Sequence, residues 1–306
     1  MEQMQSLKQE ISALLPAFSI RQEELLSKHT SFRIGGPAEL MVFPGNPQEL
    51  SSVLGAAHRH GIRPMILGAG TNILAPDEGI RGLVICLREC FMGLTLLPGN
   101  RVEAMAGMTL AQTAMFAARN GLSGLEFAHG IPGTVGGGVY MNAGAYGGEM
   151  SQIIEWVRVW TPDGVKKWNV DEMGFGYRHS RLMEENAVVL AACLKLQVGE
   201  REAIRSQMKE LMQQRKSKQP LEYPSAGSFF KRPQGHFAGA LIENAGLKGF
   251  TIGGAQISEK HAGFLINHNH ATAADVLNVM RAVQEKVFEE TGVQMENEVR
   301  IVGKDQ

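Results

Sequence analysis

The stretch GIPGTVGGGVYMNAGAYGGE, residues 130–149, concentrates glycine in short loops. The whole chain holds 36 glycines among 306 residues, well above the usual share of about 7%, and another cluster, GAG, lies at 68–70. Glycine serves where a backbone turns sharply or lies close against another group. The clustering therefore predicts either tight turns or loops that lie against a ligand.

The segment GAGTNI (68–73) follows an apolar run that predicts a strand, as the phosphate-binding turn of a dinucleotide fold does. It reads G-x-G-x-x-I, so the third glycine of an ordinary Rossmann fingerprint is missing. No G-x-x-x-x-G-K-[ST] motif occurs, which excludes the P-loop NTPases. Successive backbone N–H groups in glycine turns form anion sites. The loops at 68–73 and 130–138 are thus candidates to hold one diphosphate from two sides, with tight turns alone as the alternative.

Composition is that of a soluble globular protein, with 44% hydrophobic and 20% charged residues. A formal net charge of -1 does not suggest a nucleic-acid partner. No apolar run approaches the about 20 residues that span a bilayer, and the N-terminus lacks the order of a signal peptide, so we expect a cytoplasmic protein. Cys86, Cys90 and Cys193 form no paired motif and are expected to be buried or idle thiols.

Apolar periodicity and capping residues predict the main elements. Helices are expected over 3–15, 46–61 with Asn46 as N-cap, 109–121, 199–218 and 271–292, where Thr272 and Asp275 have the spacing of a capping box. Strands are expected over 82–87, 101–107, 154–160, 187–197 and 262–268, and the alternation in VQMENEVRIVG predicts one more over 293–303.

Three stretches carry candidate chemistry. In YPSAGSFFKRP (223–233), Ser228 lies outside the G-x-S-x-G elbow of a serine hydrolase, and a turn or cap role is the alternative for it and for Ser225. In YRHSR (177–181), arginine suits a carboxylate, with an ordinary surface arginine as the alternative. Glu296 and Glu298 share one face if their segment is a strand. HNH (268–270) with His261 has irregular spacing, so loop histidines are favoured over a metal site.

Taken in order, these motifs resemble the UDP-N-acetylenolpyruvoylglucosamine reductase family, the flavoenzymes of bacterial peptidoglycan synthesis. The resemblance rests on HTSFRIGGPAE (29–39), ILGAGTNIL (66–74), residues 130–149, YRHSR, SAGSFFKRP (225–233) and EVRIVG (298–303), which span nearly the whole chain. The short segment after YRHSR is similar to the second, more compact type of these enzymes.

The resemblance implies an α+β fold in which a two-subdomain FAD-binding module of the vanillyl-alcohol-oxidase class (PCMH-like) precedes an α+β substrate-binding domain. The implied boundaries are residues 1–80 for the first FAD-binding subdomain, 81–218 for the second and 219–297 for the substrate domain, with the strand at 298–306 returning to the first subdomain. This class holds the FAD pyrophosphate in loops between subdomains, which accounts for the incomplete Rossmann fingerprint.

The family reaction uses NADPH to reduce non-covalently bound FAD. Hydride then passes from flavin N5 to C3 of UDP-N-acetylglucosamine enolpyruvate, which gives UDP-N-acetylmuramate. By position in the motifs, Arg178 matches the arginine that polarises the substrate carboxylate, Glu298 the glutamate that stabilises the enol, and Ser228 the donor of the proton to C2. A hydroxyl suffices as the acid, because an enol or carbanion is strongly basic and the donor is already in place.

The resemblance also implies the cofactor and substrate contacts. For FAD these are Gly68, Ala69, Gly70, Thr71, Asn72, Gly130, Ile131, Pro132, Gly133, Thr134, Gly136, Gly137, Asn142, Ala143 and Gly144. Lys218, Tyr177 and Lys231 are further candidates for contact with substrate or NADPH. Where the family often has K-N-P after the serine, this chain has Lys231-Arg232-Pro233, so we expect Lys231 or Arg232 to replace an asparagine contact to the substrate's anionic groups.

Other readings stay open at this point. Another oxidase or dehydrogenase of the same flavin class would share residues 66–149, and covalent flavin at His29 would favour it. A flavin-binding module without turnover is a further alternative, and so is a serine hydrolase. The resemblance implies no metal, no nucleic-acid or membrane partner and no obligatory protein partner.

Overall fold

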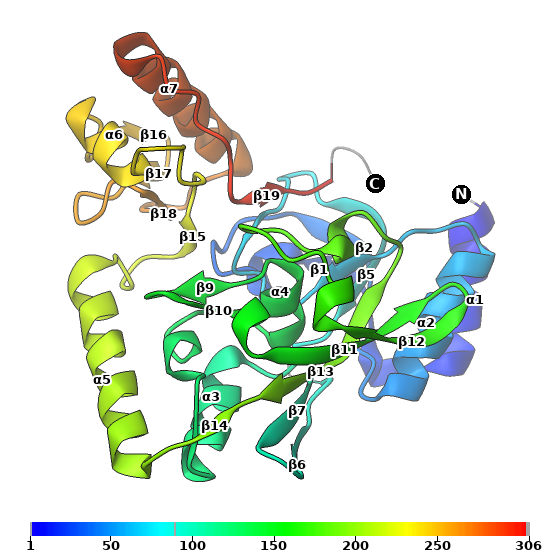
Figure 1. The fold of residues 1–306 in the computed structure, drawn as a ribbon. Coiled ribbons are helices and arrows are strands. Elements are labelled where there is room, and N and C mark those ends of the chain that lie inside the picture. The colour runs from blue at the N-terminus through cyan, green and yellow to red at the C-terminus, as the bar shows by residue number, and fades with distance from the viewer. Residues whose placement is uncertain (1, 89, 304–306) are drawn as a thin grey trace. The chain divides into compact units, whose positions relative to one another are not determined.

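The computed structural model describes residues 2–88 and 90–303 (Figure 1). They form two compact units. The first comprises the described residues of 1–22, 40–69 and 82–214, and the second those of 23–39, 70–81 and 215–306. Each of the two buried apolar clusters lies wholly inside one unit. Helices and sheets occur in both units, so the architecture is α+β.

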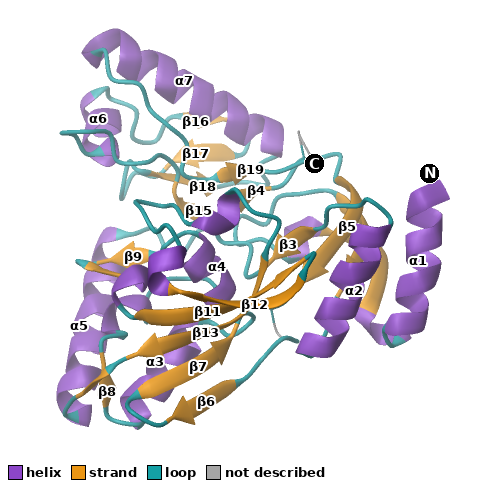
Figure 2. Ribbon diagram, turned by 45° about the vertical axis from the view of Figure 1, so that its right-hand side comes forward, coloured by secondary structure: helices purple, strands orange, loops and turns teal. Residues whose placement is uncertain are grey.

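The helices of the first unit follow the expected spacing. They are α1 (Glu2–Leu14), α2 (Pro47–Arg59), α3 (Leu110–Arg119), α4 (Val135–Tyr140) and α5 (Arg201–Lys218), the last of which ends in the second unit. α2 begins as predicted, because the Asn46 side chain accepts a hydrogen bond from the Glu49 N–H at 3.0 Å. α1 and α2 lie side by side (Figures 1 and 2).

Two main sheets involve the first unit. One has the order β1 (Ile20–Leu25), β2 (Pro37–Val42), β5 (Ile80–Cys86), β3 (Met65–Leu67). The other is antiparallel in the order β12 (Gly164–Asn169), β11 (Ile154–Thr161), β13 (Val188–Lys195), β7 (Arg101–Met105), β6 (Leu94–Leu97), as Figure 2 shows. Two short pairs add β8 (Leu122–Ser123) with β14 (Gln197–Val198), and β9 (Gly144–Ala145) with β10 (Gly148–Glu149).

The second unit contains a sheet in the order β15 (Ser225–Ser228), β18 (Phe264–Asn267), β17 (Ala255–Ile257), β16 (Thr251–Ile252). It also holds α6 (Ala238–Asn244), α7 (Ala273–Thr291) and the parallel pair β4 (Ile73–Leu74) with β19 (Arg300–Ile301). α7 packs on β16 and β17 through an apolar stripe with helical spacing, Val276, Val279, Met280, Val283 and Val287. None of the described helices is long and apolar enough to cross a bilayer.

The predicted strand over 293–303 is wrong for most of its length, because only Arg300–Ile301 is a regular strand. The alternation that suggested it does reflect burial, since Met295 and Val299 are in the core. However, the backbone bonds of the segment go to separate partners: Glu296 O accepts from Lys231 N, and Glu298 N donates to Phe229 O. A burial period of two therefore arises here without a continuous strand ladder.

Candidate functional site

Two of the glycine-rich segments meet in the first unit. A Cβ atom added at Gly68 would lie 2.4 Å from Thr134 Oγ1, so the backbone at 68 can touch the 130–137 loop only as glycine. Thr134 is itself buried and caps α4, accepting the Gly137 N–H through Oγ1 at 3.3 Å. The tertiary structure thus brings together two loops that are about 60 residues apart in the chain.

The 130–137 loop presents hydrogen-bond donors. Val135 N donates to Met108 O at 2.7 Å and Gly136 N to Ala106 O at 2.9 Å. Among the described residues, no protein acceptor takes the backbone N–H of Gly133 or Thr134. Gly133 has a φ of 150°, which favours glycine. Adjacent backbone N–H groups that are left over from the fold suit an anion.

The remainder of the first loop belongs to the second unit. Gly70 has a φ of 61°, and its O accepts the Ser31 N–H at 3.0 Å. Asn72 makes two contacts with the C-terminal segment: its Nδ2 donates to Glu298 O at 3.2 Å, and its O accepts from Arg300 N at 3.0 Å. Asn72, expected at the cofactor, therefore also holds the backbone of a catalytic candidate.

Ser228 lies at a β-bulge at the end of β15. Ser225 pairs with Ile266 and Ser228 with Phe264. Between these two pairs, β15 therefore contains one more residue than β18. Gly227 supplies the necessary conformation with a φ of 82°. Bulges re-aim side chains and recur beside active sites. Here Ser228 is exposed, while the residues that follow it, Phe229 and Phe230, are buried.

Backbone contacts join Ser228's strand to Glu298. The Glu298 N–H donates to Phe229 O at 2.9 Å, and Phe230 forms an isolated antiparallel bridge with Asn297. Glu298 is half-buried, whereas the Glu296 side chain is 74% exposed and pairs with Lys231 at 3.0 Å. The structure therefore separates the two glutamates that spacing alone left equivalent, and it places the backbone of Glu298 next to Phe229, the residue that follows Ser228.

Arg178 occupies a two-residue turn in the first unit. Gly176 and His179 exchange both backbone hydrogen bonds, Gly176 N to His179 O at 3.1 Å and His179 N to Gly176 O at 3.2 Å. Arg178 takes a φ of 56° within this turn, and its guanidinium lies 5.3 Å from the centre of the Tyr177 ring. Such a φ costs a non-glycine residue about 1–2 kcal/mol. Strained backbone of this kind clusters at functional sites.

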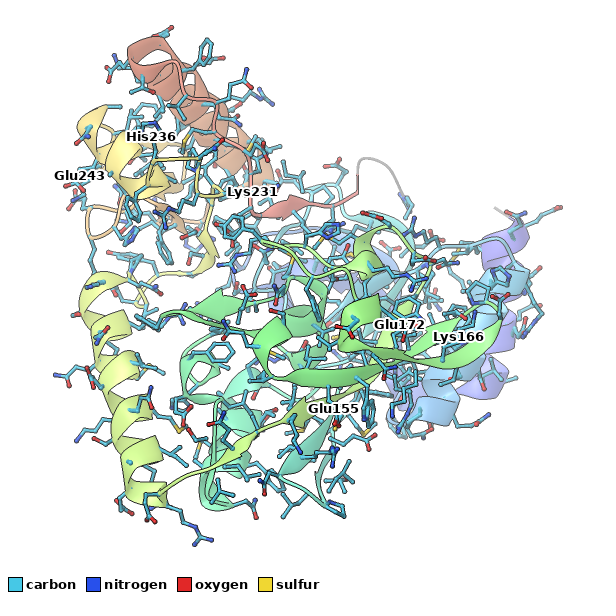
Figure 3. The ribbon with its side chains drawn as sticks, in the orientation of Figure 1. Glu155, Lys166, Glu172, Lys231, His236 and Glu243 are labelled. Atoms are coloured by element: carbon cyan, nitrogen blue, oxygen red, sulfur yellow. The ribbon has the colours of Figure 1, made fainter. Side chains whose placement is uncertain are left out.

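The other candidates have varied surroundings. Lys218 is exposed at the end of α5, and Tyr177 is 56% exposed. Lys231, labelled in Figure 3, forms an ion pair with Glu296 through its ammonium group. Arg232 stacks on the Phe237 ring at 3.9 Å and donates through Nε to His236 O at 3.3 Å. The two cations behind the serine therefore both make contacts within their own unit.

The alternative of a metal site concerns His261 and HNH (268–270). His261 Nδ1 accepts the Gly263 N–H at 3.1 Å, and burial lowers the pKa of His261. In the part of the chain that the structure describes, no group of three His, Cys, Asp or Glu residues is placed to hold a metal ion. No disulfide joins the three cysteines, of which Cys86 and Cys193 are buried.

Comparison with known proteins places the chain. Residues 219–302 match the model of the C-terminal domain of UDP-N-acetylenolpyruvoylglucosamine reductase, and residues 38–167 match an FAD binding domain. The enzyme of that name from Pediococcus pentosaceus is 47% identical over 300 residues, which cover 98% of this chain and 99% of that protein. The one from Streptococcus pneumoniae is 46% identical over 299 residues, covering 97% and 99%.

The chain belongs to the UDP-N-acetylenolpyruvoylglucosamine reductase family. It is therefore an FAD-containing oxidoreductase. A crystal structure of the reductase from Thermus caldophilus superposes with a TM-score of 0.80 at 37% identity, covering 92% of this chain and 99% of that one. The predicted family and the predicted α+β FAD-binding fold with a C-terminal domain are confirmed. The serine-hydrolase reading is excluded by membership in this family.

The residues of the two loops fit an FAD molecule. Its diphosphate needs donors, which the N–H groups of Gly133 and Thr134 can provide, on a loop that packs directly against Gly68. Two further buried atoms, Glu126 Oε1 and His129 Nδ1, have no partner in the described structure and come just before the loop. Unsatisfied buried polar atoms of this kind are rare, and a bound group with polar edges would satisfy them.

Sequence reasoning missed the bulge at Gly227 and the contact between Asn72 and Glu298. The first had a signal, since an isolated glycine inside a strand pattern indicates a bulge. The second had none, because Asn72 and Glu298 are 226 residues apart.

Proposed function

We propose that this protein reduces UDP-N-acetylglucosamine enolpyruvate to UDP-N-acetylmuramate with NADPH, as a cytoplasmic step of peptidoglycan precursor synthesis. The observation that carries the proposal is the backbone bond from Glu298 N to Phe229 O, the residue that follows Ser228, inside residues 219–302, the segment that matches the family's C-terminal domain. The proposal needs no metal and no protein, nucleic-acid or membrane partner.

FAD would be held non-covalently by the glycine loops, through the residues Gly68 to Asn72, Gly130 to Thr134, Gly136, Gly137, Ala143 and Gly144, with Asn142 in the same loop. When bound, it supplies the hydride chemistry, taking hydride from NADPH and passing it to C3 of the substrate. Support for a non-covalent cofactor comes from His29, whose Nε2 lies 2.9 Å from Glu24 Oε1. This nitrogen would have to leave its partner before it could bond a flavin.

The protein's own groups would complete the reduction. Arg178 would bind the substrate carboxylate, where negative charge accumulates as hydride arrives at C3. Glu298 would stabilise the enol form, and the Ser228 hydroxyl would deliver the proton to C2. The exposure of Ser228 at the bulge leaves its hydroxyl accessible to a substrate. Lys218, Tyr177, Lys231 and Arg232 are assigned to contacts with substrate or NADPH, and for Lys231 this requires release of Glu296.

By role, residues 1–80 and 81–218 would form the FAD-binding subdomains and 219–297 the substrate domain, with 298–306 returning to the first. The pairing of β19 with β4 supports that return. The family domain that ends at 302 supports a substrate domain of about this extent.

Replacement of Ser228 separates the two half-reactions. In Ser228→Ala, reduction of the flavin by NADPH should stay near the wild-type rate, while reoxidation by the enolpyruvyl substrate should fall by about 10²-fold or more, because the proton donor is gone. Stopped-flow absorbance of the flavin measures both steps. Ser225→Ala is the matched control, since this serine lies in the same strand and contributes its backbone O, not its hydroxyl, to the bond with Ser31.

Two results would contradict the proposal. Equal losses in both half-reactions would make Ser228 a structural residue. Purified protein that holds flavin but shows no NADPH oxidation with the enolpyruvyl substrate would favour a different flavin oxidoreductase or a module without turnover.

As for Ser228→Ala, replacement of Arg178 by alanine should slow mainly the second half-reaction, the reoxidation of the flavin by the substrate.

A further inference from the structure

Asn142 is almost completely buried, with 1% of its surface exposed. Its Nδ2 donates to Gly176 O at 3.1 Å, and its Oδ1 accepts the Ser151 N–H at 2.9 Å. Both ends of the amide are thus engaged inside the protein. The side chain therefore serves the fold around it, although the residue lies in a loop assigned to the flavin.

The acceptor of that bond, Gly176, begins the turn that carries Arg178. The turn is closed by the two Gly176–His179 bonds and holds Arg178 at a φ of 56°. Turns with a positive φ at this position normally use glycine or asparagine. An arginine stays in such a conformation only where neighbouring contacts over-determine it.

Two further contacts join the same segments. Ser180 is fully buried, and its Oγ donates to Tyr140 O at 2.7 Å. Arg178 Nη2 reaches Gly144 O at 3.4 Å. The segment from Tyr140, the last residue of α4, to Gly144 therefore holds the 176–180 turn at three points. Asn142 is the middle one, and among these three contacts it is the one to which the 140–144 segment contributes a side chain, which bonds Gly176, the first residue of the turn.

We propose that Asn142 is a positioning residue for Arg178: its amide fixes the Gly176–His179 turn and so the direction from which the guanidinium meets the substrate carboxylate. The inference rests on the proposed function for the role of Arg178. It replaces a flavin contact through the Asn142 side chain, and it links the flavin loop to the binding of the substrate's anionic end.

Asn142→Asp tests the bond directly. The aspartate keeps an oxygen for the Ser151 N–H but puts a second oxygen where Nδ2 donates to Gly176 O. Hydrogen–deuterium exchange of peptides covering 173–183, in protein with and without FAD, should accelerate by about fivefold to tenfold, as the loss of one buried hydrogen bond implies. Asn120→Asp is the control, since the exposed Asn120 side chain also donates to a backbone carbonyl, Phe116 O at 2.9 Å.

Kinetics test the consequence. Asn142→Asp should keep its FAD content and its rate of flavin reduction by NADPH, while reoxidation by the enolpyruvyl substrate falls by about 10- to 100-fold, the scale of a misplacement near 1 Å. In an Arg178→Ala background the same change should add almost nothing, because residues that act through one another are not additive.

Several results would overturn the inference: unchanged exchange over 173–183, loss of FAD without a change in the turn, or losses that multiply in the double variant. If the aspartate variant does not fold, Asn142→Gly takes its place, since glycine accepts the φ of 42° and removes both bonds. Should Arg178→Ala itself leave reoxidation unchanged, the proposed function of the arginine fails, and the exchange data alone decide whether Asn142 holds the turn.

Discussion

Single residues set the geometry of this site through backbone conformations that most residues avoid. Gly227 turns Ser228 outward at the bulge, Arg178 is held at a positive φ, and Gly70 lies where a side chain has no room. A residue scan for reactive side chains notices the serine and the arginine. Such a scan does not detect the neighbouring residues that orient these side chains, because the neighbours act through backbone conformation and hydrogen bonds.

Gly70→Ala should be strongly destabilising. Its φ is 61°, and an added Cβ would lie 2.2 Å from His29 O. The positive φ costs about 1–2 kcal/mol, and overpacking adds about 1–3 kcal/mol. Urea unfolding should show a decrease in the free energy of unfolding equal to the sum of these two costs.

Gly246→Ala is the matched control for this change. Gly246 has a φ of 71° with nothing within 4 Å of an added Cβ. Gly246→Ala should therefore lower the free energy of unfolding only by the cost of the positive φ. Equal losses in the two variants would show that the Gly70 contact yields without cost.

Among the elements, α7 shows how local and distant residues share one helix end. Thr272 and Asp275 form the predicted capping box. The Asp77 carboxylate adds bonds from Ala273 N at 2.8 Å and Ala274 N at 3.1 Å. The first N–H groups of a helix have no partner within it, and here residues on both sides of the helix start and far along the chain supply them.

Asp275→Asn should make the free energy of unfolding depend less on pH in the acidic range. Bonds from the Thr272 and Gly254 N–H groups hold the pKa of the Asp275 carboxyl below its ordinary value. Because the pKa is lowered in the folded state, the stabilisation is present above the unfolded pKa of about 3.9 and is lost as pH falls through the folded pKa.

At pH 7 the variant should therefore unfold more easily by about 0.5–1 kcal/mol, and the difference from wild type should shrink below pH 4. Denaturant unfolding across pH 3–7 measures it, with the exposed Asp171→Asn as control. A difference that stays constant into acid would contradict the assigned bonds.

At the scale of the whole molecule, the chain folds into two compact units that are each assembled from separate stretches of sequence. Residues 23–39 and 70–81 belong to the unit that contains Ser228 and Glu298, although they lie near the N-terminus. One consequence is that the GAGTNI loop is divided, with Gly68 and Ala69 in one unit and the residues from Gly70 onward in the other.

Removal of FAD should lower the stability of the whole protein. A ligand that binds only the folded chain stabilises it by about 2.7 kcal/mol at a free concentration 100 times its Kd. Thermal unfolding with graded FAD should show this rise. Riboflavin, which lacks the diphosphate, should give little of it if the glycine loops hold that group. Equal stabilisation by both ligands would place the binding energy elsewhere.

Much of the fold could be predicted from the sequence. The caps at Asn46 and Thr272, the apolar stripe of α7 and the central strands all appear where the pattern indicates them. These features depend on contacts across three or four residues or on simple alternation. The failure at 293–303 has the same origin, because alternation reports burial and not which backbone groups pair.

The sequence by itself determined the family, the glycine loops and the chemical groups available to the site, since motif order and local hydrogen bonds are properties of neighbouring residues. Only the tertiary structure decided that Gly68 touches Thr134, that Glu298 bonds the residue next to Ser228 while the Glu296 side chain pairs with Lys231, and that Asn142 holds the turn of Arg178. Those contacts join residues from 34 to more than 60 positions apart. The path of the folded chain, not any local preference, brings them within hydrogen-bonding distance.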